Sequence, residues 1–266
     1  MVDRLFADAG LAALYDQLCP RGQRADFDFY LPLVMSARAV LDVGCGTGAM
    51  LQEARDAGHR GRLCGLDPAT GMLAQARKRP GIEWILGDLA STDWDSEFDL
   101  VVMTGHAFQV LIEDHELHRS LAAIRSALSD DGRFVFETRN RLARAWDDWT
   151  PENPVEFADT GGVKVRMTRR VTATVDDRLV SFAHTFTSPK WNQPQVSTST
   201  LRFFDAASLV PFVVDAGLLI EEQFGDWNRT PVTAMSPEII TIARKDATRP
   251  QPHTTEPTPY RETTPF

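Results

Sequence analysis

The segment 41–48, Leu-Asp-Val-Gly-Cys-Gly-Thr-Gly, constrains the fold more than any other part of the chain. Residues 39–43 are mostly apolar and predict a buried strand, and residues 49–57 have the apolar spacing of a helix that ends at Gly58. The glycines at alternate positions make a turn between strand and helix that no side chain obstructs. Such a turn lets a ligand lie on the backbone at the positive end of a helix dipole. The segment therefore predicts a nucleotide-type cofactor site in an α/β fold.

Two cofactor classes are compatible with this turn. The spacing Gly44-x-Gly46-x-x-Ala49 also satisfies the dinucleotide fingerprint, which leaves a nicotinamide-dependent oxidoreductase as an alternative. Asp42 disfavours that alternative, because a carboxylate so close to the turn would repel a pyrophosphate and attract a ligand with an ammonium group. No Tyr-x-x-x-Lys pair typical of hydride transfer follows. The string Asp-x-Gly-x-Gly-x-Gly at 42–48 resembles motif I of the class I S-adenosylmethionine-dependent methyltransferases.

The resemblance continues along the chain in the order that this family requires, over about residues 38 to 139. Further apolar runs predict strands at 62–66, 82–86, 98–103 and 133–137, the last after a turn at 130–132. The resemblance implies that Asp67 binds the ribose hydroxyls, that Pro68 and Met72 pack against adenine, and that Asp88 binds the adenine amino group. The cofactor-binding residues that it implies are Tyr15, Asp42, Gly44, Cys45, Gly46, Gly48, Asp67, Pro68, Met72, Asp88, Leu89 and Thr104.

The predicted architecture is a doubly wound, Rossmann-like α/β fold with a seven-stranded, mostly parallel sheet. Residues 154–203 alternate apolar and polar side chains and predict a two- or three-stranded antiparallel β insertion before the last helix. Arg169 interrupts its apolar face. Asp205 or Ser208 can cap that last helix, and Pro211 favours a start at Ser208, because an interior proline costs about 3 kcal/mol.

The predicted organisation has four parts. They are an N-terminal helical or lid segment (1–36), the methyltransferase core (37–153 and 204–245), the β insertion as an acceptor cap or dimer element (154–203), and a disordered tail (246–266). For residues 1–36 a helix packed on the sheet is an equal alternative to a lid that carries Tyr15 and Tyr30. The core is expected to end with an antiparallel pair of strands at 218–224 and 237–243.

Catalysis in this family needs an in-line arrangement of methyl donor and acceptor, and a group that takes the acceptor's proton. His106 follows the fourth strand and is the candidate base, with a purely pocket-shaping role as the alternative. Glu137 leaves the fifth strand at the same edge and is predicted either to orient His106 or to bind a substrate amine. Residues nominated for the acceptor site, each with a core role as the alternative, are Tyr30, Arg139, Trp146, Trp149, His184, Trp191 and Trp227.

Composition narrows the class of substrate. The net charge of −9 disfavours nucleic acid as a partner, and no stretch is long and apolar enough to predict a membrane span. The three cysteines lack metal-ligand spacing, and the N-terminus lacks a signal-peptide pattern, so we expect reduced thiols in the cytoplasm and no metal. The sequence thus predicts methyl transfer from S-adenosylmethionine, yielding S-adenosylhomocysteine, to N, O or ring C of a small metabolite, as in secondary metabolism. A non-catalytic partner subunit with this fold is the remaining alternative.

Overall fold

The main sheet of the protein has seven strands in the order β10-β11-β5-β4-β1-β2-β3. It is seen in a computed structural model that describes residues 2–246 and 248. Its strands are β1 (Ala39–Val43), β2 (Arg62–Asp67), β3 (Glu83–Leu86), β4 (Phe98–Met103), β5 (Leu128–Arg139), β10 (Leu218–Phe224) and β11 (Glu238–Lys245). Strands β1 to β5 are parallel, and the β10–β11 pair is antiparallel, which confirms the predicted fold class. The predicted tail lies outside the described residues, apart from Asp246 and Thr248.

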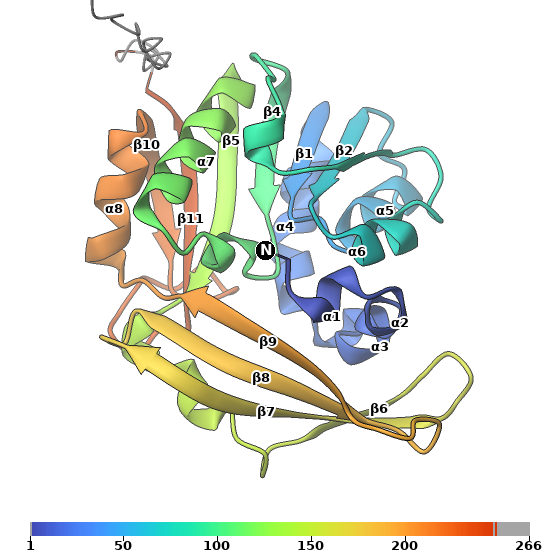
Figure 1. Ribbon diagram of the computed structural model, residues 1–266. Coiled ribbons are helices and arrows are strands. Elements are labelled where there is room, and N and C mark those ends of the chain that lie inside the picture. Colours follow the sequence, from blue (N-terminus) through green and yellow to red (C-terminus); the bar gives the residue numbers. More distant parts are fainter. Residues whose placement is uncertain (1, 247, 249–266) are drawn as a thin grey trace, which may run out of the picture.

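Helices cover both faces of this sheet (Figure 1). They are α4 (Ala25–Ser36), α5 (Ala49–Asp56), α6 (Thr70–Ala76), α7 (Asp114–Ala127) and α8 (Ala206–Asp215). One hydrophobic cluster packs α7 and α8 against the strands, and a second packs α4 and α5. The predicted turn at 130–132 falls where the pairing of β5 with β4 shifts register. Residues 25–36 form helix α4, which packs on the sheet, and this is one of the two alternatives given for the N-terminal segment.

The insertion forms a separate antiparallel sheet in the order β6-β7-β8-β9. Its strands are β6 (Val155–Ala158), β7 (Lys164–Val175), β8 (Leu179–Thr187) and β9 (Gln195–Arg202). The predicted count of two or three strands was wrong, because β6 has only four residues, too few for an alternating pattern to stand out. Strand β9 lies near the carboxyl end of β4, where the Gln109 side chain donates a hydrogen bond to the Arg202 carbonyl over 2.9 Å (Figure 1).

Short helices of the N-terminal segment lie between the two sheets (Figure 1). They are α1 (Arg4–Ala7), α2 (Ala9–Ala12), α3 (Tyr15–Leu18) and the 3-10 turn η1 (Arg21–Gln23). On one side the Leu5 backbone N–H donates to the Ser197 hydroxyl of β9 over 2.8 Å. On the other side the Thr47 hydroxyl donates to the Asp16 carboxylate over 2.5 Å. The segment thus contacts the glycine turn and the insertion together, and its lid role stays a prediction.

Helix α8 begins two residues earlier than the sequence predicted. The Asp205 carboxylate accepts a hydrogen bond from the Ser208 backbone N–H, and the Ser208 hydroxyl oxygen accepts one from the Asp205 backbone N–H, which together make a capping box. The start at Ser208 was therefore wrong, because the cap at Asp205 stabilises the first turn and Pro211 is accommodated inside the helix.

Replacement of Asp205 by alanine is expected to lower the free energy of unfolding by about 1–2 kcal/mol, because the first-turn N–H loses its acceptor. Asp205→Asn keeps a capping oxygen and loses only the charge that faces Arg141, so it is expected to cost less. Urea denaturation of the three proteins measures the difference. Equal midpoints for the alanine variant and the wild type would show that the cap contributes nothing.

Candidate active site

The glycine turn after β1 is held in a conformation that only glycine adopts easily. Gly44 has φ +73°, and a Cβ added there would lie 2.7 Å from the Ala107 Cβ. Gly48 has φ +76°, and a Cβ there would lie 2.2 Å from the Trp84 ring. Both positions therefore exclude a side chain for reasons of space and of backbone conformation. The turn thus places backbone without side chains at Gly44 and Gly48, next to the start of α5, where a nucleotide-type ligand can approach it.

Asp67, at the end of β2, braces this turn. One carboxylate oxygen accepts a hydrogen bond from the Gly46 backbone N–H over 2.8 Å, and the other accepts from the Ala69 N–H over 2.7 Å. Burial raises the pKa of Asp67, and these two hydrogen bonds act in the opposite direction. The side chain therefore joins the ends of β1 and β2 at the place where the family resemblance puts the ribose.

Asp42 is a buried carboxylate without a hydrogen-bond partner among the described residues. It is 1% exposed, and neither of its oxygens has a donor within reach. Burial, followed by the nearby charge of Asp67, raises its pKa to about 7. An unpaired buried acceptor costs free energy and fits a site that receives donors or positive charge from a ligand. The unpaired oxygens of Asp42 therefore suit a cofactor with an ammonium group.

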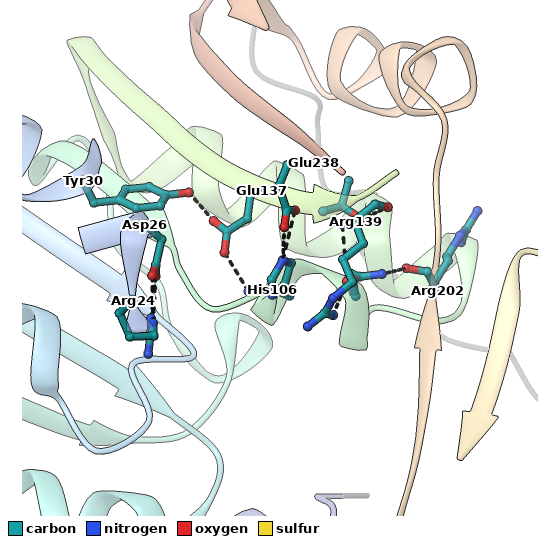
Figure 2. Close-up of polar contacts among 10 residues, drawn as sticks. Arg24, Asp26, Tyr30, His106, Glu137, Arg139, Arg202 and Glu238 are labelled. Carbon is teal, nitrogen blue, oxygen red and sulfur yellow. Dashed lines mark hydrogen bonds and ion pairs between the residues drawn. The ribbon is translucent and has the colours of Figure 1, made fainter. Parts of the chain in front are cut away.

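A cavity lies above the glycine turn and extends to the loop after β4. Its walls are Tyr15, Arg24, Phe27, Gly44, Cys45, Gly46, Thr47, Ala49, Met50, Thr104 and Gly105. Arg24 was not predicted from the sequence, because nothing in its neighbourhood distinguishes it from a surface arginine. It binds Asp26 through Nε and one terminal nitrogen, at 2.8 and 2.6 Å, and its side chain is 18% exposed (Figure 2). Burial lowers the pKa of Arg24, but the Asp26 carboxylate outweighs this and the net shift is upward.

Several residues predicted to bind the cofactor lie outside this cavity wall. Pro68 is exposed, and Asp88 is exposed and caps the short helix η2 (Leu89–Ser91) by accepting from the Ser91 N–H over 3.0 Å. Leu89 is buried in the main core, and Met72, 2% exposed, packs with Ala12 of the N-terminal segment. A contact of these residues with adenine stays a prediction.

His106 lies in the loop between β4 and the 3-10 helix η3 (Ala107–Val110), with a left-handed backbone at φ +66°. Its Nε2 lies 3.0 Å from both carboxylate oxygens of Glu238 on β11 (Figure 2). The His106 backbone N–H donates to Glu137 over 2.7 Å, and the Tyr30 hydroxyl donates to the other oxygen of Glu137. The chain thus brings the predicted base together with two carboxylates and a tyrosine from four different elements.

This geometry changes the roles predicted for Glu137 and Tyr30. Glu137 is completely buried and both of its oxygens are engaged, so it holds the His106 backbone and does not contact the imidazole. The partner of the imidazole is Glu238, which the sequence did not reveal because the two residues are 132 positions apart. Tyr30 is completely buried on α4 rather than on a lid. Burial raises the pKa of Tyr30, and the Glu137 charge adds to the shift.

The four tryptophans nominated for the acceptor site do not lie together. Trp146 and Trp149 share a cluster with Phe182 and Phe203, whereas Trp191 packs with the N-terminal helices. Trp227 packs against Phe29 and Tyr30 on α4, with ring centroids 5.9 and 6.1 Å away. A single pocket lined by all four is therefore wrong, because packing of separate apolar surfaces distributes them over three clusters.

Arg139, Trp149 and His184 remain close to one another. The guanidinium carbon of Arg139 lies 5.5 Å from the Trp149 ring centroid, and the charge of Arg139 contributes to the shift of the His184 pKa. That pKa is lowered to about 4, chiefly by burial.

Among the described residues there is no group of three His, Cys, Asp or Glu side chains placed to hold a metal ion, and no helix is long and apolar enough to cross a membrane.

Comparisons with known proteins agree with this geometry. Residues 40–132 match the family model described as a methyltransferase domain. The chain is 28% identical over 230 residues to the cypemycin N-terminal methyltransferase of a Streptomyces species, which covers 79% of this chain and 84% of the relative. It is 26% identical over 130 residues to the malonyl-[acyl-carrier protein] O-methyltransferase of Anoxybacillus flavithermus, a match that spans about half of each protein (48% and 49%).

Solved structures share the fold. The CcbJ methyltransferase from Streptomyces caelestis has a TM-score of 0.72 at 21% identity, over 89% of this chain and 96% of that one. CalS10, an amino pentose methyltransferase from Micromonospora echinaspora, was solved with S-adenosylmethionine bound and has a TM-score of 0.61 at 23% identity, over 83% and 90%. The comparisons support the predicted class, an S-adenosylmethionine-dependent methyltransferase, through a methyltransferase domain at residues 40–132 and a fold shared with such enzymes over most of the chain.

The unpaired Asp42 predicts a characteristic pH dependence of stability. Its pKa is about 7 in the folded protein against 3.8 for the ordinary group, so the folded state binds this proton more tightly than the unfolded state does. Without cofactor, the wild type should therefore lose stability relative to Asp42→Asn as pH rises from about 4 to about 7. The change amounts to at most about 4 kcal/mol. Urea denaturation of both proteins at several pH values measures it, and a difference that does not vary with pH would contradict the assignment.

Proposed function

We propose that the protein transfers a methyl group to a nitrogen, oxygen or ring carbon of a small organic acceptor by in-line displacement, with His106 as general base. The observation that supports this most directly is the His106–Glu238 pair, 3.0 Å apart, at the edge of the sheet beside the cofactor cavity. Open α/β sheets bind their ligands at the carboxyl ends of the strands, where this pair lies.

The chain's own groups account for cofactor binding. Gly44 and Gly46 give the cavity a wall without side chains, Asp67 offers a charged acceptor for hydroxyls, and Asp42 offers a second carboxylate for positive charge. Arg24 lines the same cavity. Its Nε and Nη2 bind Asp26, so Nη1 can donate to a carboxylate of the ligand. When bound, S-adenosylmethionine supplies an activated methyl group.

The proton of the acceptor is assigned to His106. A carboxylate beside Nε2 favours the tautomer with the proton on that nitrogen, so the lone pair remains on Nδ1. Glu238 acts as a positioning residue, because it fixes the ring and stabilises the positive charge that forms when Nδ1 takes a proton. Glu137 fixes the backbone of the same residue through its 2.7 Å hydrogen bond.

The surroundings of the site favour a small acceptor over a macromolecular surface. The N-terminal helices and β9 enclose this edge of the main sheet, joined by the hydrogen bond between Leu5 and Ser197. The likeness in fold to an amino pentose methyltransferase is consistent with a metabolite acceptor, as in secondary metabolism. Association of copies through the β insertion stays a prediction.

An Asp67→Ala variant is expected to bind the cofactor at least about tenfold more weakly, because it removes a charged acceptor from both the ligand and the glycine turn. Titration calorimetry with S-adenosylhomocysteine measures the affinity. Asp130→Ala, an exposed aspartate on the far part of β5, is a matched control that should bind as the wild type does. Unchanged affinity in Asp67→Ala would remove the assignment of this site.

A His106→Ala variant is expected to keep its affinity for S-adenosylhomocysteine and to lose about 100-fold or more in kcat, the usual contribution of a general base. Glu238→Gln should lower kcat less, because the imidazole remains. His115→Ala, an exposed histidine on α7, is the control. If turnover of His106→Ala matched the wild type from pH 6 to pH 9, the base assignment would be wrong.

A further inference from the structure

The buried face of the β insertion is crossed by a polar row. Along this face Met167 and Phe186 form one apolar pair of neighbouring strands, and Val171 and Phe182 form another. Between these pairs the opposed residues are Arg169 on β7, His184 on β8 and Ser197 on β9. A row of polar groups inside an apolar face is costly unless something uses it, because each group gives up water on folding.

Arg169 has no anionic partner in the described part of the chain. It forms no ion pair within 4.0 Å, and its guanidinium carbon lies 5.8 Å from the Trp149 ring centroid. Burial lowers its pKa. His184, directly opposite, keeps its Nδ1 buried and without a hydrogen-bond partner among these residues. Both polar groups are therefore left to interact with something that the chain does not supply.

Arg139 approaches the same ring from the main sheet. Its guanidinium carbon is 5.5 Å from the Trp149 centroid, and one terminal nitrogen donates to the Gln109 side chain over 2.9 Å (Figure 2). Glu238 stands directly opposite Arg139 in the β5–β11 pairing, but its two oxygens are 3.0 Å from His106. The charge of Glu238 raises the pKa of Arg139, but the hydrogen bonds of Glu238 go to the imidazole and not to the guanidinium.

The two guanidinium groups repel each other, although the charges of Glu238 and Glu137 act on Arg139 in the opposite direction. The charge of Arg169 lowers the pKa of Arg139, in addition to the larger effect of burial. An oxyanion between them would accept hydrogen bonds from both forks and remove the repulsion. The Trp149 ring supplies an apolar wall beside it.

We propose that Arg139 and Arg169 bind an anionic oxyacid group of the methyl acceptor, and that this group is a carboxylate. The proposal rests on the proposed function and specifies its substrate class. The acceptor then has two ends: a nucleophilic nitrogen or oxygen toward His106 and Glu238, and a carboxylate toward the insertion. An amino acid, or a peptide-like molecule with a free carboxylate, has this distribution of charge.

The test uses the full-length protein saturated with S-adenosylhomocysteine and titrated by calorimetry with benzoate, benzamide and phenyl phosphate. Benzoate is expected to bind and its neutral analogue benzamide to bind at least about tenfold more weakly. Arg169→Gln should remove this preference, whereas Arg170→Gln, an exposed neighbour on the opposite face of β7, should retain it. Stronger binding of phenyl phosphate than of benzoate would identify a phosphate ester in place of a carboxylate. Equal binding of all three probes would overturn the proposal.

A second measurement separates this proposal from the proposed function. Methyl transfer is followed from S-adenosylmethionine to a panel of amino acids and their amides. A preference for the free acids that Arg169→Gln abolishes, through KM more than kcat, supports the anion site. Transfer to acids and amides alike, in both proteins, overturns it while the methyltransferase function stands. Loss of S-adenosylhomocysteine binding by the wild type would instead contradict the proposed function.

Discussion

The buried carboxylate of Glu137 is the interaction on which the arrangement of the active site depends. It accepts from the His106 backbone N–H over 2.7 Å and from the Tyr30 hydroxyl, so one side chain on β5 joins α4 and the loop after β4. The carboxylate is completely buried, and its loss would leave two donors unsatisfied at a cost of about 1–3 kcal/mol each. It also holds His106 at φ +66°, a left-handed conformation that is uncommon for residues other than glycine.

The strand order of the main sheet then determines the polarity of the site. Because β5 lies between β4 and β11, the loop that carries His106 faces Glu238 across the end of β5. Antiparallel pairing places Glu238 opposite Arg139, so acid and base alternate along this edge. The negative groups gather beside the cofactor cavity and the arginines gather toward the insertion. Under the proposed function, such a distribution of charge would orient an acceptor before the methyl transfer.

Local motifs carry the prediction of the cofactor side of the site. Asp42, the glycines and Asp67 lie within short distances of one another in the sequence, and strand-turn-helix patterning fixes their relative positions. Glu238 and Arg24 could not be found in this way, because their roles come from strand pairing and from packing of the N-terminal segment. Apolar periodicity indicates that a residue is buried but not which neighbours it has, which is why the tryptophans were grouped wrongly. The start of α8 was missed because the cost of an interior Pro211 was given more weight than the alternative cap at Asp205.

The N-terminal helices give the cofactor side and the acceptor side of the site a common wall. Each of α1, α2 and α3 has only four residues, too short to be stable alone, so their order depends on what they contact. Asp16 accepts from Thr47 over 2.5 Å and pairs with Arg79 at 2.7 Å, which ties the segment to the cofactor half. Ser199 donates to Asp3 over 2.5 Å, which ties it to β9. The contacts of Asp16 and of Asp3 hold the same few turns of helix. The position of the insertion, with its polar row, relative to His106 therefore depends on contacts made at the glycine turn.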